Sequence, residues 1–310
     1  MADFKFEPSK YVPFRDKEVI ARCRAIKRED IDKHPNKDLK IRVLKDADVP
    51  YIKMTDMVAR IKKSSDEGSQ CVMILPNPAP GDRHVARLVN AMRLNCKNVH
   101  IFAMDEYADE NGNIAPDTWE FGFGYAMKKN LVYNIDEDLR MPDKNVHVFT
   151  NKNINDYGKM IADMGGADIC YSGPGWTGHV AFVEPDAPEF DMPLEEWLKT
   201  GPKVCTLSPF TLAQNSLHGS FGMSGDLSAV PPKAATIGPA EVVGSKNRID
   251  THALGVHGTA TSWQRLITRL CLHGPVTPKL PTSIHQLLRT DVYISETAAM
   301  NIEPNWDKGY

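Results

Sequence analysis

The chain has 310 residues, of which 42% are hydrophobic and 25% are charged, and its formal net charge is −3 at pH 7. This composition is typical of a globular protein with a sizeable core, and the length fits one large α/β domain or two small ones. Because acidic and basic side chains are mixed along the chain, nothing favours a nucleic-acid or membrane partner.

The cysteines and the first residues indicate a reducing compartment. The six cysteines include no CxxC pair, and Cys71 and Cys170 lie inside apolar runs, which argues against a disulfide framework. The opening residues MADFKFEPSK have no apolar signal core, and no stretch approaches 18 apolar residues. We therefore expect a cytoplasmic protein that does not bind a membrane.

Residues 1–39 differ from the rest of the chain. They are rich in charged side chains, and only the segment from Val19 to Ile26 has the pattern of a short helix. We predict an N-terminal extension that wraps the domain or forms a subunit contact; a partly disordered tail is the alternative.

From residue 40 onward, short apolar runs alternate with amphipathic stretches. The runs predict strands at residues 41–44, 71–75, 99–104, 146–149, 168–171, 204–207, 235–237, 253–256 and 292–294, and the stretches predict helices at 50–63, 83–95, 117–131, 153–164, 261–272 and 283–289. This order predicts an α/β fold with a doubly wound, mostly parallel sheet and helices on both faces. Since no linker divides it, residues 40–310 are predicted to form a single domain.

The residues that follow the predicted strands indicate where a site would lie. In such sheets, ligands bind beyond the carboxyl ends of the strands. The segments that follow four of them contain acids, histidines and glycines: 76–82, 105–107, 172–185 and 257–259. We expect these segments to come together at one edge of the sheet.

Three residues in these segments suit proton transfer, and each has a plainer interpretation. Asp105 can remove a proton from a carbon next to a carbonyl, or it caps the next segment. His179 is a candidate general acid or base, or it satisfies a buried carbonyl. Glu184 is five residues further along and would orient His179 or bind backbone amides.

Taken together, four stretches resemble a known family. They are AMDEY (103–107), SGPGWTGHVAFVEP (172–185), GVHGTATSW (255–263) and SIHQLLRTDVYISETAA (283–299). Their order and spacing resemble the glucosamine-6-phosphate deaminase/isomerase family, whose superfamily includes the 6-phosphogluconolactonases, over about residues 40–300. The resemblance implies a modified Rossmann-like fold, a homo-oligomer, and an aldose–ketose isomerisation of an amino sugar with loss of ammonia. It implies no metal and no cofactor.

The resemblance also assigns roles to individual residues. Asp105 matches the acid/base that moves the proton between C2 and C1, His179 matches the histidine that opens the sugar ring, and Glu184 matches the carboxylate that orients this histidine. Trp176 would stack on a sugar face or simply pack. Substrate binding is expected at Asn77, Glu106, Gly173, Gly175, Trp176, Thr177, Gly178, His257 and Gly258.

The chain departs from the family pattern at two places. Thr177 occupies the position of an aspartate that precedes the family's histidine, and because a threonine holds no charge, we expect the third member of the histidine system to be missing. The phosphate-binding loop is also changed: Pro78 and Pro80 have no N–H to donate, and Asp82 is predicted to cap the next helix. Two cations of the family's phosphate site are replaced, by Leu217 and Thr261. Arg83, His84 and His257 are the remaining candidates for anion contacts.

We therefore expect a sugar isomerase/deaminase whose small-molecule substrate lacks the usual 6-phosphate. The alternatives are a lactonase-type hydrolase, in which His179 would activate water, and a sugar-binding or regulatory relative that has lost turnover. A metal site formed by Asp105, Glu106, His179 and His257 has no tight ligand motif to support it.

Overall fold

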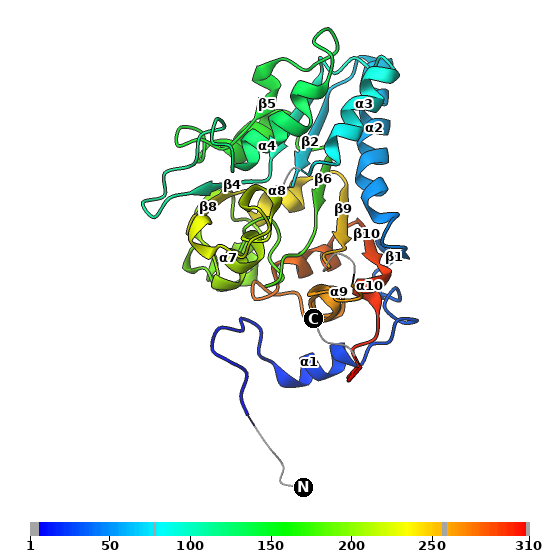
Figure 1. The fold of residues 1–310 in the computed structure, drawn as a ribbon, viewed down its shortest axis with the longest axis vertical. Helices are drawn as coiled ribbons and strands as arrows, with labels where there is room; N and C mark the ends of the chain where they lie inside the picture. Colours follow the sequence, from blue (N-terminus) through cyan, green and yellow to red (C-terminus); the bar gives the residue numbers. More distant parts are fainter. Residues whose placement is uncertain (1–5, 77–78, 256–258, 308–310) are drawn as a thin grey trace.

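The computed structural model describes residues 6–76, 79–255 and 259–307. Its main sheet has seven strands, and the pairings between neighbours are parallel. In sheet order the strands are β1 (Leu39–Leu44), β10 (Thr290–Ser295), β9 (Arg248–His252), β6 (Ile169–Ser172), β2 (Cys71–Leu75), β3 (Val99–Ala103) and β5 (Val146–His147). The predicted α/β class and parallel sheet are confirmed (Figure 1).

Alternate residues of the central strand β2 enter two different cores. Val72 and Ile74 pack in one cluster, whereas Cys71, Met73 and Leu75 pack in another. Because successive side chains of a strand point to opposite faces, both faces of the sheet are covered. This explains why β2 is an uninterrupted apolar run, with every residue buried.

The helices connect the strands and cover these faces. They are α1 (Lys17–Arg24), α2 (Val49–Glu67), α3 (Asp82–Ala91), α4 (Phe123–Asn130), α5 (Tyr157–Asp163), α6 (Leu194–Trp197), α7 (Pro209–Asn215), α8 (Pro239–Gly244), α9 (Gln264–His273) and α10 (Glu296–Ala299). Figure 1 shows α2 and α3 side by side along one flank of the sheet, and they pack against each other. The predicted helix at 283–289 is instead the 3₁₀ helix η6 (Pro281–Leu287).

A second, three-stranded sheet was not predicted. It contains β4 (Asp105–Ala108), β8 (Lys233–Thr236) and β7 (Lys203–Thr206), and its pairings are antiparallel. Two strands assigned to the parallel sheet, 204–207 and 235–237, belong here. β4 follows β3 after a single residue, which made the two strands look like one apolar run followed by a loop.

The predicted strand at 253–256 is wrong. The strand is β9, Arg248–His252, and it carries buried charged and polar side chains, including Arg248, Asp250 and His252. A search for apolar runs does not find this strand, because four of its five residues are charged or polar. The side chains of Arg248, Asp250 and His252 can be buried because they form hydrogen bonds with other parts of the chain.

The N-terminal segment lies against the domain where the structure describes it. α1 packs on α9, and Cys23 is buried in a cluster with Leu270 and Leu280. The Arg22 guanidinium donates to the carbonyl of His273 at 3.0 Å. β1 begins at Leu39, the last residue of the predicted extension. The division into an extension and one domain stays a prediction.

Candidate functional site

A cavity of about 280 Å³ lies at the carboxyl ends of four strands of the main sheet. Pro76 follows β2, Met104 and Asp105 follow β3, Ser172 ends β6, and Thr251 lies near the end of β9. The remaining described residues around this central cavity are Phe123, Gly173, Pro174, Gly175, His179, Ala181, Phe182, Gln214, Asn215, His218, Leu254 and Gln264. The cavity therefore lies where the alternation of strands and helices predicts a site.

Asp105 is the first residue of β4 and lines the central cavity. It is 6% exposed, and its carboxyl group accepts no hydrogen bond from any other residue in the described part of the chain. Burial, together with the charge of Glu106, raises the pKa of Asp105 well above the ordinary carboxyl value. A buried carboxyl group with a raised pKa and no partner suits the acceptance and return of a proton.

His179 and Glu184 form a buried pair. His179 Nδ1 lies 3.4 Å from Glu184 Oε2, and the residues are 4% and 1% exposed. Glu184 Oε1 also accepts from the backbone N–H of Ser208 at 3.2 Å. Burial favours the protonated form of Glu184, but its interactions with His179, Thr211 and Thr177 outweigh burial and lower its pKa. Glu184 is therefore an anion at neutral pH.

Two threonine hydroxyls occupy the space between this pair. Thr177 Oγ1 donates to Glu184 Oε2 at 3.0 Å and lies 3.0 Å from His179 Nδ1, and Thr211 Oγ1 lies 3.1 Å from the same nitrogen. This corrects the prediction that the histidine system lacks a third member: the charge is absent, but a hydroxyl relay is present. The relay places the imidazole hydrogen on Nδ1, which leaves Nε2 as a base.

The apolar run Val180–Val183 holds the two ends of this pair in place. All four residues are buried, a bridge joins Val180 to Val183, and Ala181 has a φ of 53°. The carbonyl of His179 accepts from the hydroxyl of Thr282 at 3.0 Å. The chain therefore makes a tight, anchored turn between the histidine and its carboxylate.

The glycines of this loop allow close approach. An ideal Cβ on Gly175 would come well within 3.0 Å of His179 Nε2, and one on Gly173 would meet the carbonyl oxygen of Thr251. Gly178 has a φ of 83° and does not line the central cavity; its carbonyl accepts from the backbone N–H of Thr282. These contacts explain why the loop needs glycine at these three positions.

We expect Gly175→Ala to displace the His179 ring and to lower the free energy of unfolding by about 1–3 kcal/mol, as overpacking of a filled site does. Gly244→Ala is the matched control, because a Cβ at that position meets nothing within 4 Å. Denaturant unfolding of both variants checks this. Equal stability of the two variants would show that the loop relaxes around the added methyl group.

Two residues predicted to bind substrate point elsewhere. The Trp176 ring packs on Trp263 at a centroid distance of 4.3 Å, beside a separate apolar cavity of about 310 Å³ that Val12, Pro13 and Phe14 also line. Both oxygens of Glu106 accept backbone N–H groups, from Tyr107, Phe123 and Gly124. Burial raises the pKa of Glu106 to about 7 despite these bonds. We assign both residues to packing and to the start of α4.

The loop at residues 76–82, where the resemblance leads us to expect phosphate binding, differs from the prediction at Asp82. The prediction that Asp82 caps α3 is wrong. Its carboxylate is buried and pairs with Lys53 Nζ at 3.0 Å. The structure includes Leu217 and Thr261, whose uncharged side chains stand where the resemblance leads us to expect two cations. Asn77, Pro78, His257 and Gly258 lie outside the described residues, so their predicted roles stay predictions.

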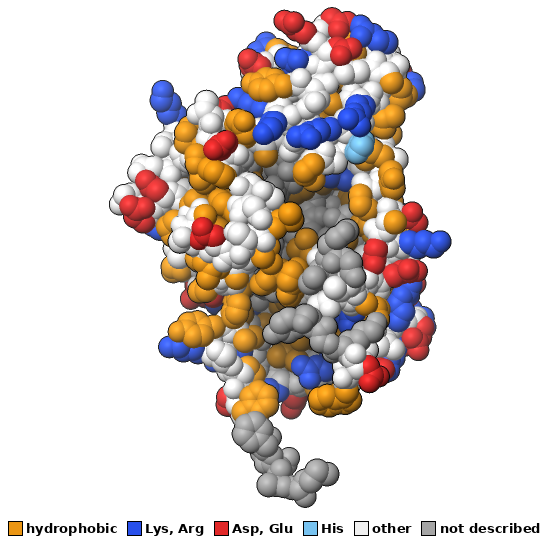
Figure 2. Space-filling view, in the orientation of Figure 1, with side chains coloured by type: hydrophobic (Ala, Val, Ile, Leu, Met, Phe, Trp, Pro, Cys, Tyr) orange, Lys and Arg blue, Asp and Glu red, His pale blue; other side chains and the backbone are white. Residues whose placement is uncertain are grey.

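The remaining cations lie in neighbouring cavities. Arg83 and Lys129 line a cavity of about 390 Å³ together with Glu120. This cavity adjoins the central cavity, because Phe123 and His218 line both. His84 lines a different cavity with Lys53 and Asp82. Figure 2 shows basic side chains gathered over α3 and α4, above a hollow in this face.

Several cavity residues were missed by the sequence analysis. Burial, followed by the nearby His179, lowers the pKa of His218 to about 4, so this cavity residue is neutral. Asn215 is buried, and its side-chain nitrogen has no hydrogen-bond partner in the described part of the chain. Gln264 fixes the loop by donating to the carbonyl of Pro174 and accepting from the N–H of Leu254. Ser172 did give a signal, since it directly follows the predicted strand at 168–171 and opens the segment 172–185.

The described residues include no cluster of three or more His, Cys, Asp or Glu side chains arranged to hold a metal ion. Within the same ranges, no helix is both long and apolar enough to cross a membrane.

Comparison with known proteins finds relatives that are glucosamine-6-phosphate deaminases. The glucosamine-6-phosphate deaminase of Lachnoclostridium phytofermentans is 29% identical over 185 residues, which cover 58% of this chain and 67% of that protein. Glucosamine-6-phosphate deaminase 1 of Giardia intestinalis is 29% identical over 216 residues, or 66% of this chain and 71% of that protein. No family model matches the chain.

Solved structures show the same fold. A monomeric glucosamine-6-phosphate deaminase superposes with a TM-score of 0.68 at 20% identity, covering 84% of this chain and 99% of that one. The 6-phosphogluconolactonase of Leishmania guyanensis superposes with a TM-score of 0.59 at 14% identity, covering 86% and 99%.

The chain thus shares its fold with a glucosamine-6-phosphate deaminase and with 6-phosphogluconolactonases of known structure. In sequence, the chain is similar to the glucosamine-6-phosphate deaminases, at 29% identity over the matched residues. Because one structure of the same fold is that of a monomeric enzyme, the likeness does not support the predicted homo-oligomer.

Proposed function

We propose that the protein is an enzyme of carbohydrate metabolism that isomerises a hexose or hexosamine between aldose and ketose, and that releases ammonia when C2 carries an amino group. The observation that carries this proposal is the buried carboxyl group of Asp105, which no described residue hydrogen-bonds, in the same cavity as His179. Isomerisation needs a base for a carbon acid and a second group that handles the ring oxygen. The central cavity offers one of each.

In this mechanism His179 opens the ring. Its Nε2 takes the proton of the anomeric hydroxyl and returns it to the ring oxygen as the bond from C1 to that oxygen breaks. Thr177 and Glu184 on the Nδ1 side stabilise the imidazolium that forms in between. A buried anion with a lowered pKa suits this role.

Asp105 then moves a proton from C2 to C1. Its carboxylate removes the C2 proton while O1 is protonated, which gives an enediol or enolamine. The resulting acid returns the proton to C1 while the C2 hydroxyl or amino group gives up a proton. In all, one proton moves from C2 to C1 through Asp105, and a second moves from the C2 substituent to O1. With an amino group at C2, the product is an imine, which water hydrolyses to the ketose and ammonia. The raised pKa of Asp105 favours both acceptance and return of the proton.

We further propose that the substrate lacks the usual 6-phosphate. The chain carries Ala79, Pro80, Leu217 and Thr261 where the resemblance leads us to expect donors and cations. Lys53 already forms a salt bridge with the Asp82 carboxylate, so this cation is not available to a phosphate in the loop. A dianion buried there would lose hydration without gaining compensating partners.

We expect glucosamine 6-phosphate to bind no more tightly than glucosamine. Titration calorimetry with both sugars measures this directly. Tenfold tighter binding of the phosphorylated sugar, about 1.4 kcal/mol, would overturn this part of the proposal. Charge reversal of Arg83 and Lys129 would then identify the cations that hold the phosphate.

Assays of the purified protein separate this function from its alternatives. Ammonia release and conversion of aldose to ketose, on hexoses and hexosamines with and without 6-phosphate, test the isomerase. Hydrolysis of sugar lactones without either activity would favour the lactonase-type hydrolase, in which His179 activates water and Asp105 has no part. Sugar binding without any turnover would favour the regulatory relative.

A further inference from the structure

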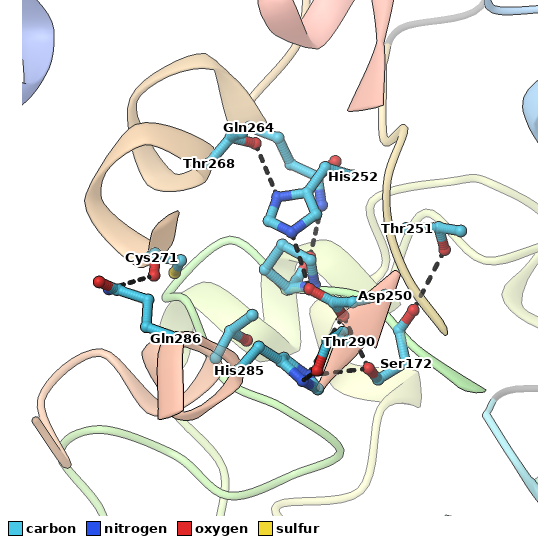
Figure 3. A network of polar contacts seen from close by, with 12 residues as sticks. Ser172, Asp250, Thr251, His252, Gln264, Thr268, Cys271, His285, Gln286 and Thr290 are labelled. Carbon is cyan, nitrogen blue, oxygen red and sulfur yellow. Dashed lines mark hydrogen bonds and ion pairs between the residues drawn. The ribbon is translucent and has the colours of Figure 1, made fainter. Parts of the chain in front are cut away.

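Figure 3 shows a buried polar network that reaches the central cavity through Ser172. Asp250, His252 and His285 each have no exposed surface, and Ser172 is 3% exposed. Ser172 and Asp250 are paired residues on the neighbouring strands β6 and β9, and His285 comes from η6. Of these four residues, only Ser172 lines the cavity. The proposed mechanism uses none of them.

The charge at the centre of this network is that of Asp250. Burial alone would raise its pKa, but His285, His252 and Ser172 together hold the pKa at about 2. Asp250 is therefore an anion, and both of its oxygens can only accept hydrogen bonds. Oδ1 lies 2.7 Å from Ser172 Oγ, and Oδ2 lies 2.8 Å from His252 Nε2.

These distances assign the hydrogens. The hydroxyl hydrogen of Ser172 belongs to Asp250 Oδ1, because charge-assisted bonds to a carboxylate are the stronger ones. His285 Nε2 lies 3.1 Å from Ser172 Oγ and 3.6 Å from Asp250 Oδ1, so its N–H donates to the serine oxygen. The hydroxyl of Thr290, at 3.2 Å, donates to His285 Nδ1.

The Ser172 oxygen can act toward the cavity only as a hydrogen-bond acceptor. A hydroxyl has one hydrogen and two lone pairs. Asp250 takes the hydrogen and His285 occupies one lone pair, so one lone pair remains for a ligand. A hydroxyl or amino group of the ligand can donate to it, whereas a carbonyl, carboxylate or phosphate oxygen would meet only another acceptor.

The same arrangement argues against Ser172 as a nucleophile. A nucleophilic serine needs a base that takes its proton as it attacks. Here His285 Nε2 carries a hydrogen and donates, and the serine hydrogen points to a carboxylate with a pKa of about 2, which is a weak base. The network orients the serine rather than activating it.

We propose that Ser172 is a specificity-determining residue that accepts a hydrogen bond from a hydroxyl or amino group of the substrate, and that Asp250 and His285 are positioning residues that hold it as an acceptor. This inference rests on the proposed function for the class of ligand. It adds that the sugar must present a donor at the floor of the cavity, and it predicts which substitutions of the sugar are rejected.

Calorimetric titration of a sugar and its monodeoxy analogues tests this assignment. Glucosamine and glucose serve as parents, each compared with analogues that lack one hydroxyl or the amino group. In the wild-type protein, one analogue should bind about tenfold more weakly than its parent, the upper range for one neutral hydrogen bond. In Ser172→Ala the parent should fall to the affinity of that analogue, and the analogue should bind as before.

Ser64→Ala is the matched control. It also removes a buried serine hydroxyl, but this hydroxyl donates to the backbone carbonyl of Ser69 and does not line the central cavity. We expect Ser64→Ala to keep the discrimination between parent and analogue. Since Ser172→Ala removes the hydrogen-bond partner of Asp250 Oδ1 and of His285 Nε2, Ser172→Cys carries the test if the alanine variant does not fold.

The outcomes separate this inference from the proposed function. If the wild type isomerises the parent sugar but the serine variants keep the full discrimination, Ser172 does not read the ligand and the inference is overturned. The same follows if every analogue binds wild type as well as its parent. If wild type neither binds nor converts any sugar of the panel, the proposed function fails and this assignment fails with it.

Discussion

Asp105→Asn should reduce kcat for isomerisation on the order of 10²-fold or more while leaving the fold intact. The amide keeps the shape of the carboxyl group but cannot accept a proton from carbon. Because no described residue hydrogen-bonds the Asp105 carboxyl, the substitution breaks no hydrogen bond within the described part of the chain. Steady-state kinetics and a thermal melt measure the two effects.

The adjacent carboxylate is the control for this prediction. Glu106→Gln replaces one of the two oxygens that bind the backbone at the start of α4, so it should lower stability and leave turnover of the folded fraction largely unchanged. If Asp105→Asn retains near-normal turnover, Asp105 is not the base.

The pH profile gives an independent measure of Asp105. Only its ionised form is a base, so kcat/KM should rise as the pH increases through its pKa. Because burial and Glu106 raise this pKa, the acid limb should lie above the value of about 4 that an ordinary aspartate shows. Its loss in Asp105→Asn would assign the limb to this residue.

His179→Asn should also reduce turnover on the order of 10²-fold or more, since the variant has no base for ring opening. Glu184→Gln should cost less, because it leaves the imidazole and the Thr177 hydroxyl in place. The double variant should be little worse than His179→Asn, as is usual for residues that act as a unit.

A double-mutant cycle on kcat/KM measures this coupling. Fully additive losses would show that Glu184 acts apart from His179, and its part would then be to hold the backbone N–H of Ser208. A substrate supplied in the open-chain form separates the steps further: it should restore turnover of His179→Asn but not of Asp105→Asn.

The local pattern of apolar and polar residues predicted much of the fold, and it located two parts of the site, Asp105 and the loop that leads to His179. The apolar run at residues 71–75 could only be a strand buried on both faces, and this is what β2 is. Asp105 and the loop that leads to His179 were located because ligand-binding residues follow the carboxyl ends of such strands. Family likeness then added their expected roles, since the segments 103–107 and 172–185 are distinctive.

The tertiary structure decided how the polar groups are paired. Thr177 is read in isolation as the loss of a charge, but in the fold it joins His179 to Glu184. Asp82 looks like a helix cap, yet its partner is Lys53 on another helix. Ser172, Asp250 and His285 are far apart in sequence and meet only when β6, β9 and η6 pack together.

The physical reason is the range of the interactions. Hydrophobic burial in a strand or helix repeats with the period of that element, so it leaves a pattern in neighbouring residues. A buried hydrogen bond between distant segments depends on the position of two atoms and leaves no periodic trace in the chain. The sequence by itself therefore determined the sheet and the place of the site, whereas the partners that set the chemistry of His179 and Ser172 were decided by packing.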